Sequence, residues 1–236
     1  MLAVNSGIDP LLKRPFSIHR RLGGDFQILY RVTGKGTAIL SKRCLGDILE
    51  VVGPLGKGFP VKTTRDKIIL VAGGVGIAPI FALAEEIKMK KPLLFYGART
   101  KDEALCLNEL KSLGIKPVIS TDDGSLGAKD NIVNVLKDFL SHNSVGARLP
   151  RPYSQLLTLN PSPVTRHVIY ACGPEPMLRA LSLLAKEYNL KGYIALEQNM
   201  ACGIGACLGC VVKTKEGYKR VCKEGPVFPI EEVVWE

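Results

Sequence analysis

Four cysteines near the C-terminus constrain the chain more than any other feature. Cys202, Cys207 and Cys210 follow the pattern C-x4-C-x2-C, and eleven residues separate the third from Cys222. This spacing is typical of plant-type [2Fe–2S] sites, in which three thiolates from one tight loop and a distant fourth surround two irons. The glycines between the cysteines permit the tight turns that such a loop needs. The spacing therefore predicts a [2Fe–2S] cluster.

A structural zinc site is the alternative interpretation, because four thiolates also suit tetrahedral Zn²⁺. Zinc ribbons usually present two separate C-x2-C pairs, and this chain has a single one, Cys207–Cys210. The spacing favours iron–sulfur over zinc.

The middle of the chain alternates buried strands with helices. Unbroken apolar runs followed by Gly-rich turns and apolar helices are typical of a doubly wound parallel sheet. The expected strands are 67–72, 92–98, 116–121, 167–172 and 192–197, and the expected helices are 78–89, 102–113, 131–140 and 175–188. We expect an α/β nucleotide-binding domain over residues 63–196, with a proline-rich surface insertion at 141–166. Most insertions of this kind have no function of their own, and we expect none here.

The N-terminal part has a different rhythm. Short β-like runs at 16–20, 26–32 and 47–52 alternate with Gly-rich turns, and a helical turn is expected at 37–43. Strands without long helices indicate a small antiparallel barrel. The predicted organisation is a barrel domain at 1–62, the α/β domain at 63–196 and a cluster module at 197–236.

A glycine-rich turn, Gly73-Gly74-Val75-Gly76, directly follows the first buried strand. Such a turn lets the backbone approach a pyrophosphate, and the helix N-terminus offers free N–H donors. It is not the G-x-G-x-x-G fingerprint, and alone it is also compatible with a strand-to-helix turn that binds nothing. Three more small or polar turns follow later strands, and ligands of open α/β sheets bind at that edge. They comprise Gly97, Arg99, Asp122, Cys172, Gly173 and Pro174.

The first clear strand carries Arg14-Pro15-Phe16-Ser17. An Arg there can clamp a diphosphate, and a Ser hydroxyl can hydrogen-bond a flavin edge. As a bare tetrapeptide it is a weak signal and is more typical of a basic surface strand.

Charge and hydropathy exclude several other classes. The net charge is +10, yet residues 1–43 hold eight Lys/Arg against two acidic residues, whereas 197–236 hold five against six. There is no basic run or aromatic cluster for nucleic acid, no apolar run of about 18–20 residues for a membrane span, and no basic start typical of a signal peptide. We expect a cytoplasmic protein that binds neither nucleic acid nor membrane, and no disulfide framework among its seven cysteines.

Together these motifs resemble the ferredoxin–NADP reductase superfamily, in which a β-barrel binds a flavin and an α/β domain binds a nicotinamide dinucleotide. Finer matches are to the electron-transfer subunits of type B dihydroorotate dehydrogenase. They are DPLLK at 9–13, LYR at 29–31, KGT at 35–37, GPLG at 53–56, YGAR at 96–99, TDDGS at 121–125, CGPEPML at 172–178 and CKEGPVF at 222–228. Because the family's chains begin further upstream, the resemblance implies an N-terminally incomplete barrel.

The resemblance implies three cofactor sites. FAD would be held by Arg14, Pro15, Phe16, Ser17, Leu29, Tyr30, Arg31, Gly36 and Thr37, with Ser17 near the flavin ring. NAD would be framed by Gly73–Gly76, Gly97, Arg99, Asp122 and Cys172–Pro174, with Cys172 near the nicotinamide. Cys202, Cys207, Cys210 and Cys222 would bind the cluster. Asp122 and its acidic neighbour Asp123 favour NAD over NADP.

The implied activity is electron transfer from a partner's FMN, reduced by dihydroorotate, through [2Fe–2S] and FAD to NAD⁺. The partner would be the FMN-containing catalytic subunit in a heterotetramer of two plus two, and no acid–base catalytic residue is expected in this chain. Alternatives are an NAD(P)H reductase subunit of another redox complex, hydrogenase-like or glutamate-synthase-like, and a zinc-stabilised nucleotide-binding module without redox activity.

Overall fold

A seven-stranded sheet organises the computed structural model, which describes residues 1–5, 7–61, 67–145 and 167–235. Six strands are parallel and lie in the order β8-β7-β3-β4-β5-β6, and β11 is added antiparallel beside β8. Starting at β3, the chain adds strands first on one side and then on the other, which is the predicted doubly wound arrangement. The strands are β3 (Lys67–Gly73), β4 (Leu93–Ala98), β5 (Val118–Thr121), β6 (Ala128–Lys129), β7 (His167–Cys172), β8 (Lys191–Ala195) and β11 (Val227–Pro229).

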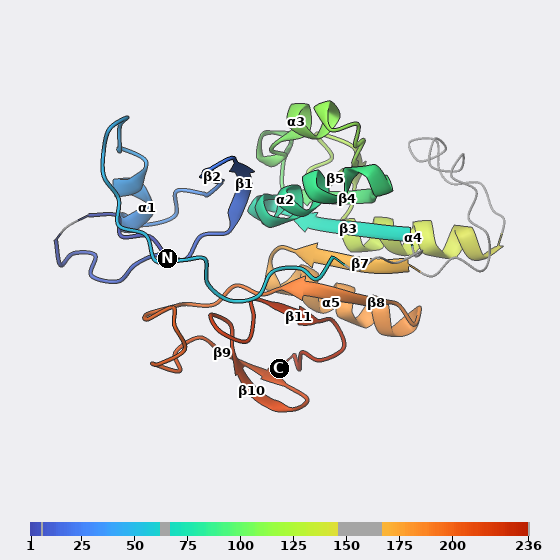
Figure 1. Ribbon diagram of the computed structural model, residues 1–236. Helices are drawn as coiled ribbons and strands as arrows, with labels where there is room; N and C mark the ends of the chain where they lie inside the picture. Colours follow the sequence, from blue (N-terminus) through green and yellow to red (C-terminus); the bar gives the residue numbers. More distant parts are fainter. Residues whose placement is uncertain (6, 62–66, 146–166, 236) are drawn as a thin grey trace.

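Helices cover both faces of this sheet (Figure 1). One apolar core packs α2 (Ile77–Ile87) and α3 (Leu107–Ser112) against the sheet. The other core packs α4 (Ile132–Val145) and α5 (Glu175–Glu187) against the opposite face. Strands β3 and β7 are almost completely buried, as their unbroken apolar runs require.

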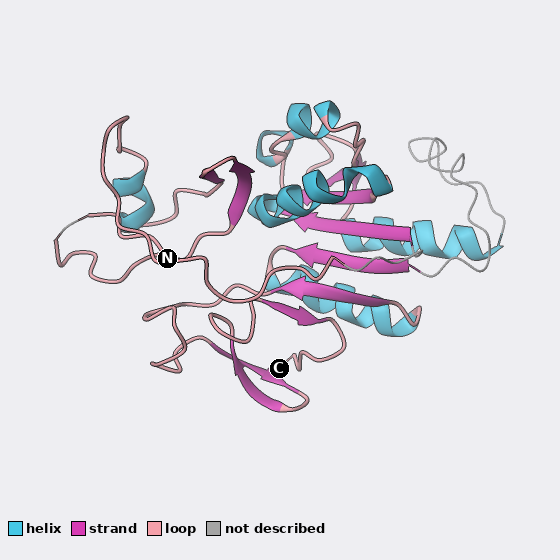
Figure 2. Cartoon of the chain, viewed as in Figure 1, coloured by secondary structure: helices cyan, strands magenta, loops and turns pink. Residues whose placement is uncertain are grey.

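The N-terminal part forms an open β structure beside the carboxyl ends of the strands (Figure 2). Its hairpin joins β1 (Ile18–Leu22) to β2 (Asp25–Ile28), and α1 (Lys35–Leu40) follows. Leu2 bridges to both Arg14 and Val51, and a small core forms around Leu2, Val4 and Leu40. Among residues 1–5 and 7–61 these pairings do not close a barrel.

The C-terminal part is a second hairpin, β9 (Val211–Thr214) with β10 (Gly217–Arg220), fastened to the main sheet by β11. Cys210, Cys222 and Phe228 are buried in the same core as α4 and α5. The module therefore packs as an extension of the α/β domain rather than as a separate unit.

Several expected boundaries are wrong. Helix α4 continues to Val145, so the first residues of the predicted 141–166 insertion are helical, and the rest lies outside the described residues. The helix expected at 102–113 is a 3-10 turn (Lys101–Glu103) and then α3, because Cys106 adopts a left-handed conformation with φ of 62°. Only a bridge at Val51 represents the strand expected at 47–52. Two further 3-10 turns flank α2, at Gly74–Gly76 and Lys88–Lys90. The proposed boundary at 62/63 falls outside the described residues.

Candidate functional site

The four predicted nucleotide turns meet at one edge of the sheet. They follow β7, β3, β4 and β5, which are consecutive parallel neighbours. The register places Ala72 beside Cys172, Gly73 beside Gly97, and Ala98 beside Thr121. Their carboxyl ends therefore line one crevice, where open α/β sheets bind their ligands.

Close packing explains three glycines at this edge. A Cβ on Gly73 would lie 2.6 Å from Met177 Sδ, one on Gly76 would lie 2.4 Å from the Cys172 carbonyl oxygen, and one on Gly173 would lie 2.5 Å from Met177 Cε. Gly73 and Gly76 were predicted to let the backbone approach a pyrophosphate, and Gly173 to frame NAD, but all three also fit closely against the protein, and the backbone neighbour of Gly76 leaves no room for a side chain. Gly74 differs, because its φ is +53° and a Cβ there would meet nothing within 4 Å. Gly74 is the position of the turn that is open to a ligand.

The Tyr96 hydroxyl fixes the glycine-rich turn. It lies 3.2 Å from the carbonyl oxygens of Gly74 and Glu103, and it accepts the Leu105 amide at 3.0 Å. Burial of the ring and hydroxyl raises the pKa of Tyr96 to about 12, so the hydroxyl stays protonated at neutral pH. Sequence reasoning assigned Tyr96 no role of its own, although the YGAR motif contains it.

The remaining predicted nucleotide residues have contrasting surroundings. Cys172 is 2% exposed, and its burial raises the pKa of the thiol well above the ordinary value. Arg99, Asp122 and Pro174 are exposed at the same edge. Asp123 accepts hydrogen bonds from the Ser125 hydroxyl at 2.6 Å and amide at 2.9 Å, which lower the pKa of its carboxyl group.

Predicted flavin residues gather in the N-terminal part. A Cβ on the buried Gly36 would lie 2.9 Å from Arg14 Nε, so this guanidinium rests against the start of α1. Thr37 Oγ1 accepts the Thr33 and Gly34 amides at 2.9 and 3.2 Å and thereby closes the first turn of that helix. An Arg fork beside a helix start suits a diphosphate.

Aromatic contact aligns the two predicted flavin segments. The Phe16 and Tyr30 rings meet edge to face, with centroids 5.5 Å apart. Ser17 beside Phe16 is exposed, as is Pro15, and Leu29 beside Tyr30 is half-buried. The hydroxyl of Ser17 is thus free of the core around Leu2, Val4 and Leu40.

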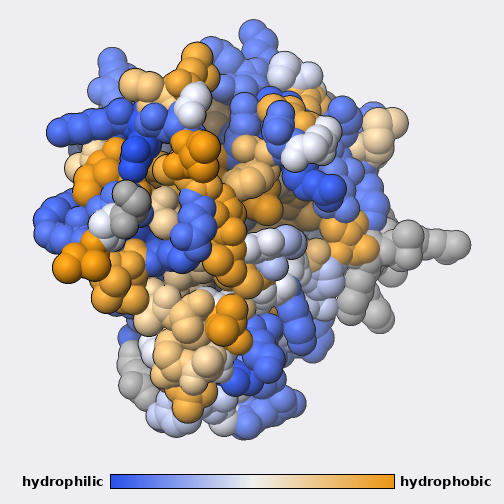
Figure 3. Space-filling model, turned by 60° about the vertical axis from the view of Figure 1, so that its left-hand side comes forward, coloured by the Kyte–Doolittle hydropathy of each residue, from blue (hydrophilic) through white to orange (hydrophobic). Residues whose placement is uncertain are grey.

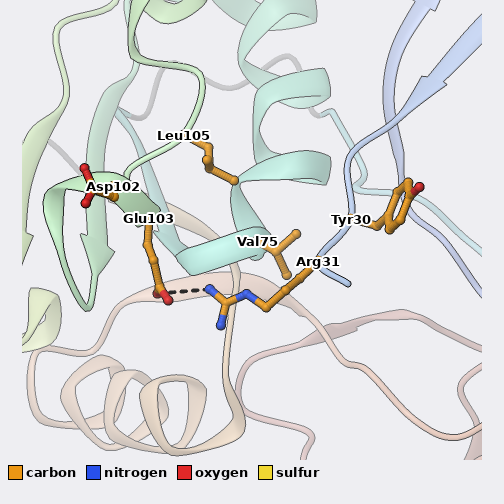
Figure 4. A pocket seen from close by; sticks show the side chains of 6 residues that line it. All are labelled: Tyr30, Arg31, Val75, Asp102, Glu103 and Leu105. Carbon is orange, nitrogen blue, oxygen red and sulfur yellow. Dashed lines mark ion pairs between the residues drawn. The ribbon is translucent and has the colours of Figure 1, made fainter. Parts of the chain in front are cut away.

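A pocket of about 220 Å³ lies between the N-terminal part and the nucleotide edge. It is lined by Tyr30, Arg31, Val75, Asp102, Glu103 and Leu105. Figure 4 shows the Arg31 and Glu103 side chains pointing toward one another, and their charged groups are 2.9 Å apart. Asp102, Glu103 and Leu105 were not among the predicted site residues. Their position directly after the YGAR strand was the signal that could have found them.

The four cluster cysteines are arranged as two pairs. The Cys207 amide lies 3.4 Å from Cys202 Sγ, and the Cys222 amide lies 3.4 Å from Cys210 Sγ. Left-handed conformations at Gly203, with φ of 72°, and at neighbouring loop positions fold the first pair back on itself. Within the described residues, no three histidine, cysteine or acidic side chains converge closely enough to hold a metal ion.

The surroundings of the thiols fit an iron–sulfur cluster. Backbone amides around Cys202, foremost that of Cys207, lower the pKa of its thiol to about 6. Burial and the neighbouring Cys210 raise the pKa of Cys222 to about 11. Amides directed at sulfur are the donors that stabilise cluster charge. The four residues thus offer the right donor atoms, and their joint ligation of a cluster remains a prediction.

The cysteine loop packs against the N-terminal part of the chain. A Cβ on Gly203 would lie 2.6 Å from Met1 Cγ and 3.1 Å from Leu55 Cδ1. One on Gly56 would lie 2.4 Å from the Gly225 carbonyl oxygen, which also accepts the Lys57 amide at 2.5 Å. We call these contacts the seam. They place the cysteine loop directly against the N-terminal part.

Comparisons with known domain families agree with this layout. Residues 197–234 match the iron–sulfur cluster binding domain of dihydroorotate dehydrogenase B, and residues 70–182 match the oxidoreductase NAD-binding domain. Together with the fold, these matches support the predicted cofactors: FAD, an iron–sulfur cluster and NAD.

A solved structure with a similar fold is that of an NADH-dependent reduced ferredoxin–NADP oxidoreductase. It is 28% identical with a TM-score of 0.76, over 95% of this chain and 75% of that one. The ferredoxin reductase of carbazole 1,9a-dioxygenase has a TM-score of 0.57 at 22% identity, over 76% of this chain and 53% of that one, and supports the fold alone.

Curated relatives identify the family. The dihydroorotate dehydrogenase B (NAD(+)) electron transfer subunit of Desulforamulus reducens is 38% identical over 97% of this chain and 82% of its own length. The subunit of that name from Caldanaerobacter subterraneus subsp. tengcongensis is also 38% identical, over 95% and 81%. The chain therefore belongs to the family of dihydroorotate dehydrogenase B (NAD(+)) electron transfer subunits.

Proposed function

We propose that this chain carries electrons from a dihydroorotate-oxidising subunit to NAD⁺. The observation that carries the proposal is the seam, which brings the cysteine loop against the part of the chain that holds the predicted flavin residues. Such proximity is what an electron-transfer chain needs. A zinc-stabilised nucleotide-binding module would not need it.

When bound, the cluster supplies one-electron transfer, NAD takes hydride, and the flavin supplies both kinds of chemistry. The protein's own residues bind and orient these groups. Arg14 would neutralise the FAD diphosphate beside Gly36 and Thr37, and Ser17 would hydrogen-bond the flavin ring. Gly74 would let the backbone approach the NAD pyrophosphate, and Cys172 would lie near the nicotinamide ring.

The preference for NAD over NADP would come from Asp122 and Asp123. Both carboxylates lie at the carboxyl edge of the sheet, and hydrogen bonds from Ser125 keep Asp123 ionised. A 2′-phosphate there would meet like charge, which disfavours binding.

The partner would be the FMN-containing catalytic subunit, in a heterotetramer of two plus two. Hydrophobic side chains gather on the face of the N-terminal part that Figure 3 brings forward. Among the exposed apolar residues are Ile8, Leu11, Leu45, Ile48 and, on the cysteine loop, Ile204 and Leu208. Exposed apolar side chains that gather on one face are typical of a protein interface. All seven cysteines are free thiols, which suits a cytoplasmic location.

The decisive experiment is anaerobic purification of the chain alone and with a dihydroorotate-oxidising FMN subunit. We expect flavin and iron–sulfur absorption from the isolated chain, and NADH-driven reduction of artificial acceptors without dihydroorotate oxidation. Dihydroorotate-dependent NAD⁺ reduction should require both chains. A colourless, zinc-containing protein, or dihydroorotate oxidation by this chain alone, would refute the proposal.

A second candidate is a reductase subunit of another redox complex. The 28% identity to a NADH-dependent reduced ferredoxin–NADP oxidoreductase supports it, since that protein shares the fold over most of this chain. The partner that copurifies from the native source distinguishes the two functions.

A further inference from the structure

The four cluster cysteines come from two separate segments that something must hold together. Cys202, Cys207 and Cys210 lie in the loop 202–210, whereas Cys222 lies in the turn 220–225 after β10. Arg220, the last residue of β10, contacts both segments.

Glu224 fixes the direction of the Arg220 side chain. Arg220 Nε donates to Glu224 Oε2 at 2.9 Å, and Nη2 donates to Oε1 of the same carboxylate. Glu224 Oε2 also accepts the backbone amide of Arg220 at 2.8 Å. This two-pronged contact leaves the guanidinium little rotational freedom.

The remaining guanidinium nitrogen reaches the other segment. Arg220 Nη1 donates to the Gly205 carbonyl oxygen at 2.8 Å, midway between Cys202 and Cys207. Gly205 adopts a left-handed conformation, with φ of +83°, within the loop. The carbonyl oxygen of Arg220 meanwhile accepts the amides of Lys223, Glu224 and Gly225 at 3.2, 2.9 and 3.2 Å, which closes the turn around Cys222.

Charge gives this contact a second consequence. The Arg220 and Glu224 side chains are 27% and 29% exposed, so solvent screens the pair only in part. Together they are nearly neutral, but removing either partner leaves one unpaired, partly screened charge near the cysteines.

We propose that Arg220 is a positioning residue that joins the loop 202–210 to the turn carrying Cys222, and that the Arg220–Glu224 pair balances charge at the cluster. This inference rests on the proposed function, because it assumes that the four cysteines bind a [2Fe–2S] cluster. It goes beyond that function because it gives a role at the cluster to Arg220 and Glu224, which are not predicted cluster ligands.

The first test measures cluster retention in anaerobically purified Arg220→Met and Arg220→Lys, by iron and sulfide content and by the decay of visible absorption with a chelator. A charge-assisted hydrogen bond supports a roughly ten- to hundredfold effect. We expect Arg220→Met to lose its cluster at least about tenfold faster, and Arg220→Lys to be intermediate because lysine lacks the fork.

Lys219→Met is the matched control. Lys219 precedes Arg220 on β10 and pairs with Glu216 and Glu232 rather than with the cysteine loop. It should lose its cluster at the wild-type rate. Equal loss from the Lys219 and Arg220 variants, with equal unfolding midpoints, would overturn the inference.

The second test measures the reduction potential of the cluster by spectroelectrochemistry. Glu224→Gln leaves Arg220 unpaired and should raise the potential, whereas Arg220→Met leaves Glu224 unpaired and should lower it. The double variant should return toward the wild-type value. If the pair had a purely structural role, the two single variants would not shift the reduction potential in opposite directions. Wild-type protein without any cluster would refute the proposed function instead, and a wild-type cluster with potentials unchanged in all variants would refute the inference alone.

Discussion

At the scale of single residues, the glycine-rich turn after β3 combines two different requirements. Gly76 is needed by the fold, because its neighbour at 2.4 Å is a backbone carbonyl oxygen that cannot move aside. Gly74 has open space where a side chain would go, so the fold requires only its left-handed backbone. Two glycines of one motif, separated only by Val75, thus meet different requirements: Gly76 the packing of the fold, and Gly74 the backbone conformation of the turn.

Alanine at each position should separate stability from nucleotide binding. Gly76→Ala should destabilise the protein by about 1–3 kcal/mol or more, because the added methyl overlaps the Cys172 carbonyl. Gly74→Ala should cost about 1–2 kcal/mol, the penalty of a left-handed alanine, yet raise the KM for NADH with flavin and iron content unchanged. Urea unfolding and NADH titration measure these effects. Gly58→Ala, where a Cβ meets nothing within 4 Å, is the control. An unchanged KM in Gly74→Ala would argue against NAD at this turn.

At the scale of elements, β1 is held to the α/β domain through α2. The His19 ring is 8% exposed, packs on Phe81 with centroids 4.6 Å apart, and has Nδ1 3.3 Å from the Ala78 carbonyl oxygen. Arg20 pairs with Glu85 at 2.6 Å on the same face. These contacts fix the N-terminal part relative to the α/β domain.

This contact should weaken at low pH. Burial is the main cause that lowers the pKa of His19. Among the charged groups that face the ring, Arg20 lowers this pKa further, whereas Glu85 and Glu109 raise it. The thiol of Cys106 lies 3.9 Å from His19 Nε2. The unfolded chain therefore binds a proton more readily than the folded one. Stability is intact above about pH 6.5 and falls as the pH drops below it.

The measurement is the urea midpoint between pH 5 and 8. His19→Gln should remove part of the decline, because glutamine takes up no proton, while Arg21→Gln on the exposed neighbour should keep the wild-type slope. Parallel slopes for His19→Gln and the wild type would contradict a buried neutral histidine at this contact.

The secondary-structure elements differed in how well they could be predicted from their own residues. The central strands β3 and β7 could be predicted because burial on both faces leaves an unbroken apolar run. The short strands β6, β9 and β11 could not, since their pairing depends on distant partners rather than on local pattern. The break before α3 was also hidden, because nothing in the sequence around Cys106 marks a left-handed residue. The candidate site was likewise only partly predictable. Its turns could be predicted from the local sequence, but the close packing of Gly76 and Gly173 and the hydrogen bonds of Tyr96 depend on residues that are distant in the sequence.

At the scale of the whole molecule, the seam joins parts that lie far apart in the sequence. The turn at Gly56 meets Gly225 near the cysteines, and Met1 and Leu55 meet Gly203 within the cysteine loop. If electrons cross here, loosening the seam should slow their transfer without affecting nucleotide binding.

Gly56→Ala tests this expectation. Gly56 has a φ of +70°, and an added Cβ would lie 2.4 Å from the Gly225 carbonyl oxygen, so the two parts must move apart. We expect stopped-flow traces with NADH to show flavin reduction at the wild-type rate and slower reduction of the cluster. Gly46→Ala carries the same left-handed penalty, with φ of +90°, but meets nothing within 4 Å.

The two glycines therefore differ in contact and not in backbone strain. Slower cluster reduction in Gly56→Ala but not in Gly46→Ala would locate the electron path at the seam, because only one substitution separates the parts. Equal rates in both variants, with cluster content intact, would mean that electrons leave the flavin elsewhere. The cysteine loop would then face the N-terminal part for packing alone.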